Sequence, residues 1–112
     1  MALYHPGDIV LIAFPYTNLK KIKKRPALVL LNVGDNDVLV ARITGKQMHA
    51  DFNVLINEWS GIGLLMPSVV RIHKLGTIEE DIIEKKIGVL HKKDWVNVCV
   101  TARKLFQEIQ KR

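Results

Sequence analysis

Hydrophobic residues fall in short runs separated by turn-forming residues, which is the pattern of a chain built mainly from strands. The first run, Asp8–Phe14, is bounded by prolines and predicts a strand covered on both faces. Pro26–Leu31 predicts a second strand, with its proline at the first position, where a strand tolerates it. After a turn at Gly34–Asn36, Asp37–Thr44 predicts a third strand.

The second half of the chain continues this pattern less regularly. Phe52–Ile56 indicates a short strand, and Glu58–Gly63 is typical of a loop. Strand character returns after Pro67 within Leu64–Leu75. A turn around Glu79–Asp81 then leads into a final strand, which the pattern places at Ile82–Leu90.

From Lys92 onward the hydrophobic period changes from two to about 3.6, which predicts an amphipathic C-terminal helix. Its apolar stripe comprises Trp95, Val98, Cys99, Ala102, Leu105, Phe106 and Ile109. Five or six short strands followed by one helix predict a mainly β fold, a small and strongly curved β-barrel. A doubly wound α/β sheet would need helices between the strands, and the pattern has none there.

The length and net charge of the chain indicate the number of domains and the kind of partner. The chain has 112 residues, which fits a single domain spanning 1–112. Its net charge is +6, from 17 Lys and Arg against 11 Asp and Glu, and this favours a negatively charged partner. The clustering of cations is the stronger signal. Five of them stand in one short segment: Lys20, Lys21, Lys23, Lys24 and Arg25.

Cysteine and histidine usage bears on compartment and metal binding. Cys99 is alone, so no intramolecular disulfide forms, and with neither a secretory signal nor an apolar run of membrane-spanning length we expect a cytoplasmic protein. The histidines at 5, 49, 73 and 91 are widely spaced, and we predict no metal site and no cofactor. Trp59 and Trp95 are candidates for stacking on bases, although Trp95 fits the helix stripe better.

Three segments together resemble one known family. They are GDIVLIAFPYTNLKKIKKRPALVL near the start, VLVARIT, and SVVRIHKLGTIEEDIIEKKIGVL before the helix. In content and order they are similar to the MazF/PemK (Kid) toxins of type II toxin–antitoxin systems. The resemblance implies an SH3-like barrel, a homodimer, and cleavage of single-stranded RNA to 2′,3′-cyclic phosphate and 5′-hydroxyl ends without a metal. It further implies a cognate antitoxin with an acidic tail, and a toxin–antitoxin complex that binds DNA.

Carried over residue by residue, the resemblance gives four catalytic candidates. The family's arginine after the first loop corresponds to Arg25, its active-site threonine to Thr44, and a second arginine to Arg71. Where some members have an aspartate two residues later, this chain has His73, and Gly45 stands where a small polar residue is common. The first loop lacks the histidine that some members use. Candidate RNA-binding residues are Tyr16, Thr17, Lys20, Lys21, Lys23, Lys24 and Lys46.

These residue types suit metal-free cleavage of RNA. Arginine donates two hydrogen bonds to phosphate oxygens but is a poor acid, so Arg25 and Arg71 would stabilise negative charge on the reacting phosphate. Thr44 would offer its hydroxyl to the phosphate or the 2′-oxygen. Arg71 and His73 share one face of a strand, about 6.6 Å apart. We hypothesise that His73 replaces the aspartate in proton transfer.

Simpler interpretations stay open for each residue. Arg25 can be a solvated loop cation, Arg71 can hold a carboxylate, His73 can be a structural hydrogen-bonding residue, and Thr44 is common in strands. At the level of function, one alternative is a relative that binds RNA without cleaving it. Another is a protein-targeting toxin like CcdB, which shares the fold and acts on gyrase. The KKRPALVL segment favours the nucleases.

Overall fold

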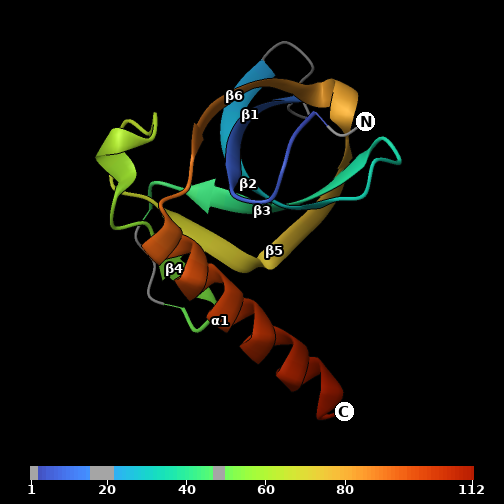
Figure 1. Cartoon of the computed structure of the whole chain (residues 1–112), viewed down its shortest axis with the longest axis vertical. Helices are drawn as coiled ribbons and strands as arrows, with labels where there is room; N and C mark the ends of the chain where they lie inside the picture. The colour runs from blue at the N-terminus through green and yellow to red at the C-terminus, as the bar shows by residue number, and fades with distance from the viewer. Residues whose placement is uncertain (1–2, 16–21, 47–49) are drawn as a thin grey trace.

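The computed structural model describes residues 3–15, 22–46 and 50–112, and Figure 1 shows its elements. The strands are β1 (Asp8–Pro15), β2 (Ile22–Asn32), β3 (Asp37–Thr44), β4 (Asn53–Leu55), β5 (Val69–Glu79) and β6 (Ile83–Val89). Two 3₁₀ turns, η1 (Trp59–Gly61) and η2 (Glu80–Ile82), and the C-terminal helix α1 (Lys92–Gln110) complete the fold.

One six-stranded antiparallel sheet forms the body of the molecule, in the order β4-β5-β3-β2-β1-β6. The sheet curls strongly, so that β6 and the end of β5 face β2 and β3 across the interior (Figure 1). No pairing joins β4 to β6 among the described strands, so the sheet is barrel-like and open. The prediction of a mainly β, barrel-like fold with a C-terminal helix is confirmed.

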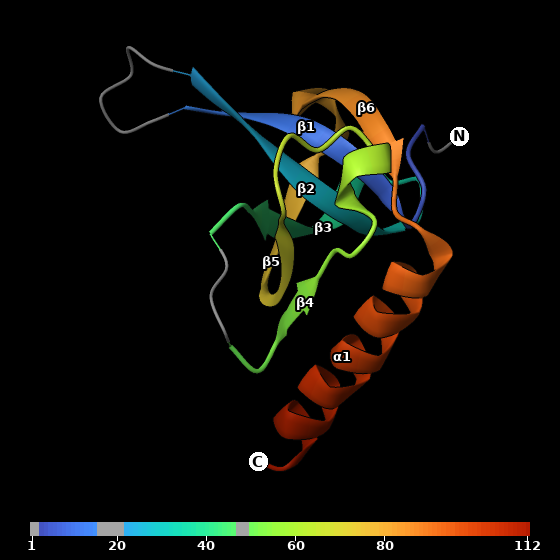
Figure 2. The same cartoon turned by 90° about the vertical axis from the view of Figure 1, so that its left-hand side faces the viewer.

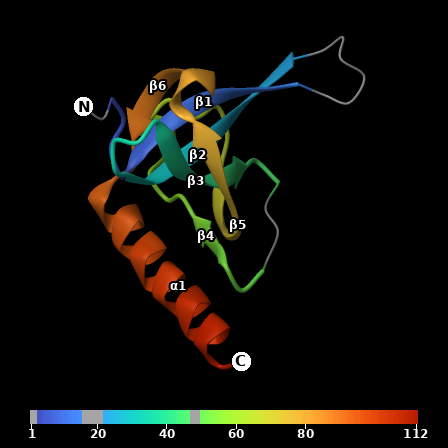
Figure 3. The same cartoon turned by 90° about the vertical axis from the view of Figure 1, so that its right-hand side faces the viewer.

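Two strands differ from the prediction: β5 continues to Glu79, and β2 begins at Ile22, so that its proline lies inside the strand. Pro26 pairs with Leu11 of β1, and that ladder continues on both sides of it. The β2–β3 pairing ends at Ala27, so one side of β2 is an edge beside Pro26, where a strand tolerates a missing N–H. The ends of β1 and β2 therefore project as a two-stranded arm, which Figures 2 and 3 show from opposite sides.

Two hydrophobic cores lie on opposite faces of the curled sheet. The interior of the curl holds one cluster, composed of Val10, Ile12, Ala27, Val29, Val38, Val40 and Ile83. The other cluster includes Ile9, Leu28, Ile43 and Val70 and is covered by α1 and the segment before β5. Consecutive residues such as Ile9 and Val10 thus enter different cores, which explains why the strands are continuously apolar.

The helix α1 packs on β4 and β5 and then extends beyond the sheet (Figure 1). Val98 is buried in the core, and Trp95 packs against the same core, as does Trp59 of η1. Phe106 and Ile109, however, are 55% and 59% exposed, so the apolar stripe predicted from the sequence covers the core as far as Leu105 and not over the last turn of the helix. No helix within the described ranges is long and apolar enough to cross a membrane.

Candidate active site

The end of the β2–β3 ladder brings two of the predicted residues together. Ala27 pairs with Arg42, and continuing that register by two residues leads to Arg25 opposite Thr44. Both side chains line the same hollow, a cavity of about 410 Å³ that we call the Thr44 pocket. Residues 19 positions apart in the chain thereby line one pocket.

The Thr44 pocket combines apolar walls with a positive rim. Leu64, Leu65 and Met66 supply much of the wall. Lys24, Arg25 and Lys85 supply the charge, and no carboxylate belongs to the lining among the described residues. Lys24 also forms an ion pair with Glu84, Nζ to Oε1 2.8 Å, so part of its charge is compensated. The balance remains positive, which suits a phosphate-bearing ligand.

Two glycines allow the wall to lie close to β6. A Cβ at Gly63 would lie 2.4 Å from the carbonyl oxygen of Ile87, and a Cβ at Gly88 would lie 2.1 Å from that of Ile62. Gly63 also has φ +86°, a conformation that L side chains rarely adopt. Backbone contact at these two points positions the η1 segment beside β6 (Figure 2), and with it the wall of the pocket.

The threonine is held with its hydroxyl proton free to donate. Thr44 Oγ1 accepts a hydrogen bond from the backbone N–H of Lys46 at 3.2 Å, which leaves the O–H available for a ligand. The neighbouring Gly45 is in contact with Met66. A Cβ at Gly45 would lie 2.2 Å from the Met66 sulfur, so this glycine, where the family often has a small polar residue, makes room for the methionine.

Arg71 and His73 form a second pair, on β5. Val70 and Ile72 are buried, whereas Arg71 is partly exposed and His73 is exposed, as expected if Arg71 and His73 lie on the face opposite Val70 and Ile72. Arg71 pairs with Arg42 of β3 rather than with Thr44. It therefore lies two strands from Arg25, about 10 Å across the sheet, and neither Arg71 nor His73 lines the Thr44 pocket.

His73 has a shifted proton affinity although its side chain is exposed. Its ring lies 6.1 Å from that of Phe52, centroid to centroid, with the planes tilted by 48°. Partial loss of hydration lowers the pKa of His73, and the positive charges of Arg71 and Lys74 lower it further. A neutral imidazole at neutral pH is the form that accepts a proton.

Only some of the predicted RNA-binding residues are among those that the structure describes. Tyr16, Thr17, Lys20 and Lys21 lie outside the described residues. The backbone of Lys23 pairs with Phe14 in the two-stranded arm. Lys24 lines the Thr44 pocket, and Lys46, two residues after Thr44, is exposed.

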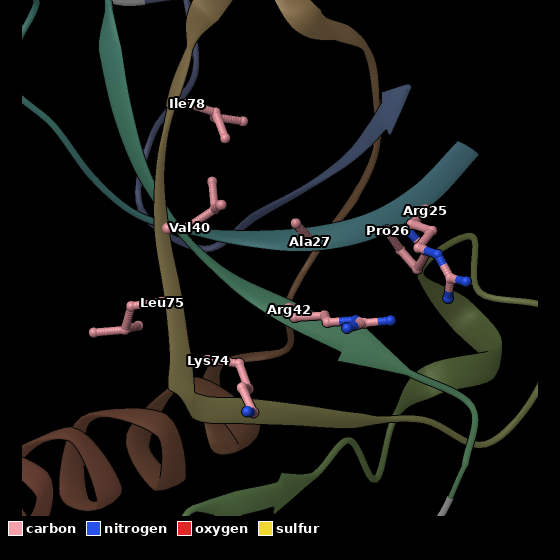
Figure 4. A pocket seen from close by; sticks show the side chains of 9 residues that line it. Arg25, Pro26, Ala27, Val40, Arg42, Lys74, Leu75 and Ile78 are labelled. Atoms are coloured by element: carbon pink, nitrogen blue, oxygen red, sulfur yellow. The ribbon is translucent and has the colours of Figure 1, made fainter. Parts of the chain in front are cut away.

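Three cations beside the site were not anticipated from the sequence. Lys85 lines the Thr44 pocket, and Arg42 and Lys74 line a second hollow that also includes Arg25 (Figure 4). Arg42 shares the strand face of Thr44, and that spacing was a usable signal; nothing in the local pattern marks Lys74 or Lys85. Within the described residues, no three His, Cys, Asp or Glu side chains gather in a way that could hold a metal ion.

Comparison with known protein families shows to which of them this chain is related. Residues 5–106 match the family described as the PemK-like, MazF-like toxin of type II toxin–antitoxin systems. The chain belongs to this family. No curated protein sequence matches this toxin closely enough to count as a relative.

Solved structures of MazF toxins share the fold of this toxin. Mycobacterium tuberculosis toxin MazF-mt6 superposes with a TM-score of 0.74 at 23% identity, covering 89% of this chain and 96% of that one. MazE–MazF from Deinococcus radiodurans gives 0.77 at 16% identity, covering 95% and 98%. An endoribonuclease in complex with its cognate antitoxin, from a mycobacterial species, gives 0.75 at 14% identity, covering 91% and 93%. At these identities the likeness establishes the fold.

Proposed function

We propose that this toxin is a metal-independent endoribonuclease that cleaves single-stranded RNA. The observation that supports the proposal is that Arg25 and Thr44 line one positively charged hollow. An endoribonuclease of the same fold from a mycobacterial species supports it. We further propose that cleavage is selective for sequence and acts on mRNA, as the resemblance implies.

The chemistry follows from what each group can donate. The 2′-oxygen of the substrate attacks the adjacent phosphorus, a pentacoordinate phosphorane forms, and the 5′-oxygen leaves, which gives a 2′,3′-cyclic phosphate and a 5′-hydroxyl. The guanidinium of Arg25 would hold two non-bridging oxygens as their charge increases. The hydroxyl of Thr44, oriented by the N–H of Lys46, would donate to the same phosphate or to the 2′-oxygen.

Arg71 and His73 would act from the neighbouring part of the sheet. In this proposal Arg71 binds a phosphate oxygen, and neutral His73 takes the proton of the 2′-hydroxyl, the task of the missing aspartate. The lowered pKa of His73 favours the neutral form. The 2′-hydroxyl and the phosphate that it attacks belong to one nucleotide step, so His73 takes part only if that step binds between the two pairs, within reach of both His73 and Arg25.

The partners follow from family and charge. We propose a homodimer and a cognate antitoxin whose acidic, partly disordered tail covers the basic site. The MazE–MazF complexes of the same fold support the second partner. Binding of DNA by the toxin–antitoxin complex, and action in the cytoplasm, belong to the same proposal.

Cleavage in the presence of EDTA tests the function. Wild type, Arg25→Ala and a matched control, Arg103→Ala on the exposed face of α1, are incubated with a long single-stranded RNA, and the products are resolved by gel electrophoresis and mass spectrometry. We expect cleavage with cyclic phosphate ends by wild type and the control, and none by Arg25→Ala. Uncleaved RNA with the wild type would refute the nuclease assignment.

A second candidate, an RNA-binding relative without activity, is favoured by one observation. His73 replaces the aspartate and lies away from the Arg25–Thr44 pair. Binding without cleavage in the same assay would select this candidate. Failure to bind RNA would direct the search to a protein target such as gyrase.

A further inference from the structure

A second hollow opens at the mouth of the barrel, on the other side of Arg25. Its volume is about 310 Å³, and we call it the barrel-mouth pocket. Ala27, Val40 and Ile78 form an apolar floor that is continuous with the core inside the curl. Arg25 and Arg42 stand on its rim with their side chains directed to the same end of the pocket, and Lys74 lines it from β5 (Figure 4).

Arg42 and Lys74 of this pocket, and Arg71 next to it, have no carboxylate partner among the described residues. Arg42 lies opposite Arg71 in the β3–β5 ladder, and like charges facing each other across a ladder repel. No carboxylate lines the pocket, and Arg42, Arg71 and Lys74 make no ion pair with any described residue. A bound anion would relieve this repulsion.

A bulge in β5 directs Lys74 to the pocket. Ala41 pairs with Leu75, but the next residue of β3, Arg42, pairs with Arg71, so three residues of β5 face no partner on β3. By regular alternation Lys74 would share the face of Ile72, which is buried in the core. Instead Lys74 is exposed and lines the barrel mouth, as expected where a bulge redirects a side chain.

We propose that the barrel-mouth pocket is a second nucleotide-binding subsite for single-stranded RNA. Arg42 and Lys74 bind one phosphate group of the strand, and the apolar floor receives an unstacked base next to it. Arg25 lines both pockets, so the strand crosses Arg25 on its way from the Thr44 pocket to the barrel mouth. The subsite rests on the proposed function, because it extends the same RNA-binding surface.

The chemistry of the pocket favours RNA over an acidic peptide. Carboxylates of a peptide would satisfy the two cations but would leave the apolar floor without a planar group to cover it. A nucleotide offers both a phosphate and a flat base within one repeating unit. Because Arg25 lines both pockets, an RNA strand bound at the Thr44 pocket already passes the edge of the barrel-mouth pocket.

The salt dependence of RNA binding tests the phosphate contacts. The probe is a fluorescein-labelled single-stranded 2′-O-methyl RNA of mixed sequence, which offers no 2′-hydroxyl for attack, and the dissociation constant is measured at several salt concentrations. In Arg42→Gln/Lys74→Gln the slope of log K against log salt should fall by about 0.7, the contribution of the one phosphate that the two side chains bind on a single strand. The matched control, Arg103→Gln/Lys104→Gln, removes the same charges from α1 and should leave the slope unchanged.

A second measurement tests the base contact. A series of probes, each with one abasic position, is bound to wild type and to the double variant. One abasic position should weaken binding to wild type clearly more than binding to the variant, because the variant no longer holds that nucleotide in place. Thermal unfolding of all variants confirms that they are folded, as expected for exposed side chains.

The outcomes separate the subsite from the function. If wild type binds and cleaves RNA while the pocket variant keeps the slope of its control, the subsite is wrong and the proposed function stands. If the pocket variant loses binding of a polyglutamate peptide and keeps that of RNA, the pocket serves a protein partner and the subsite is again wrong. If wild type binds no RNA at all, both proposals fail together.

Discussion

The Arg25–Thr44 pair and the Arg71–His73 pair are built in different ways. Arg25 and Thr44 meet across two strands, in a hollow walled by the segment between η1 and β5. Arg71 and His73 follow each other along one strand, where β5 departs from its regular pairing with β3. The first pair has a defined pocket and an oriented hydroxyl, whereas the second pair lies on an exposed surface and includes His73, whose pKa is lowered.

Under the proposed function, this difference predicts that the first pair stabilises the charge of the reacting phosphate more strongly than the second pair does. Stabilisation of a phosphorane requires donors fixed where the charge develops. The Arg25–Thr44 pair suits this condition, because Arg25 pairs with Ile12 of β1, Thr44 pairs with Val69 of β5, and the N–H of Lys46 orients the hydroxyl. Each of the following tests perturbs one pair and uses the other as its reference.

The largest effect is expected from the first pair. Arg25→Ala should lower kcat by about 10²- to 10³-fold, since it removes a charge-stabilising donor. A double-mutant cycle with Thr44→Ala should be strongly non-additive, because the two groups would hold one phosphate. The cycle of Arg25→Ala with Arg71→Ala should be closer to additive. Equal coupling in the two cycles, measured by steady-state cleavage of a fluorogenic RNA, would remove the distinction between the pairs.

The sequence reveals these two pairs unequally. The two-residue alternation of side chains along a strand places Arg71 and His73 on one face, and the burial of Val70 and Ile72 agrees with this placement. The same rule says nothing of Arg25 and Thr44, because their proximity depends on the register between strands. Only the family resemblance joined these two residues in advance.

Register and irregularity also explain what the pattern did not predict. The strands and the helix were found because core faces repeat with fixed periods. β2 was predicted too short because a proline normally marks a strand boundary, and the edge beside Pro26 overrides that preference. Lys74 reaches the barrel mouth through a bulge, and a bulge has no signature in the hydrophobic pattern.

A second prediction concerns the wall of the Thr44 pocket, which lies beside the Arg25–Thr44 pair and not beside the Arg71–His73 pair. Asp94 of α1 is fully buried, and its carboxylate accepts hydrogen bonds from the N–H groups of Asn57 and Glu58, both at 3.1 Å. These bonds hold the segment that continues into the pocket wall. Asp94→Ala leaves two donors unsatisfied and should lower the free energy of unfolding by about 3 kcal/mol, measured by urea denaturation. Asp94→Asn should cost less, because its amide oxygen still accepts; an alanine variant as stable as wild type would contradict the assignment.

A smaller change tests the shape of the Thr44 pocket. Gly45→Ser restores the small polar residue common in the family, but its Cβ would meet the sulfur of Met66. Because a methionine side chain is flexible, the cost in stability should stay below about 1 kcal/mol, while the displaced Met66 should lower the rate of cleavage. Gly45→Ser/Met66→Ala should recover the rate. A single variant with the activity of wild type would show that Met66 does not shape the site.

The smallest effect is expected from the Arg71–His73 pair, as a dependence of stability and cleavage on pH. The pKa of His73 lies below 6.5, first through loss of hydration and then through Arg71 and Lys74. Between the folded pKa and 6.5 the unfolded chain binds more protons, so this group makes stability rise with pH across that window and fall on acidification. NMR titration should give a midpoint below 6.5 that rises in Arg71→Gln but does not reach it, because hydration loss remains. If His73 is the base, cleavage falls at acid pH with the same midpoint; an unchanged rate and pH profile in His73→Ala would exclude that role.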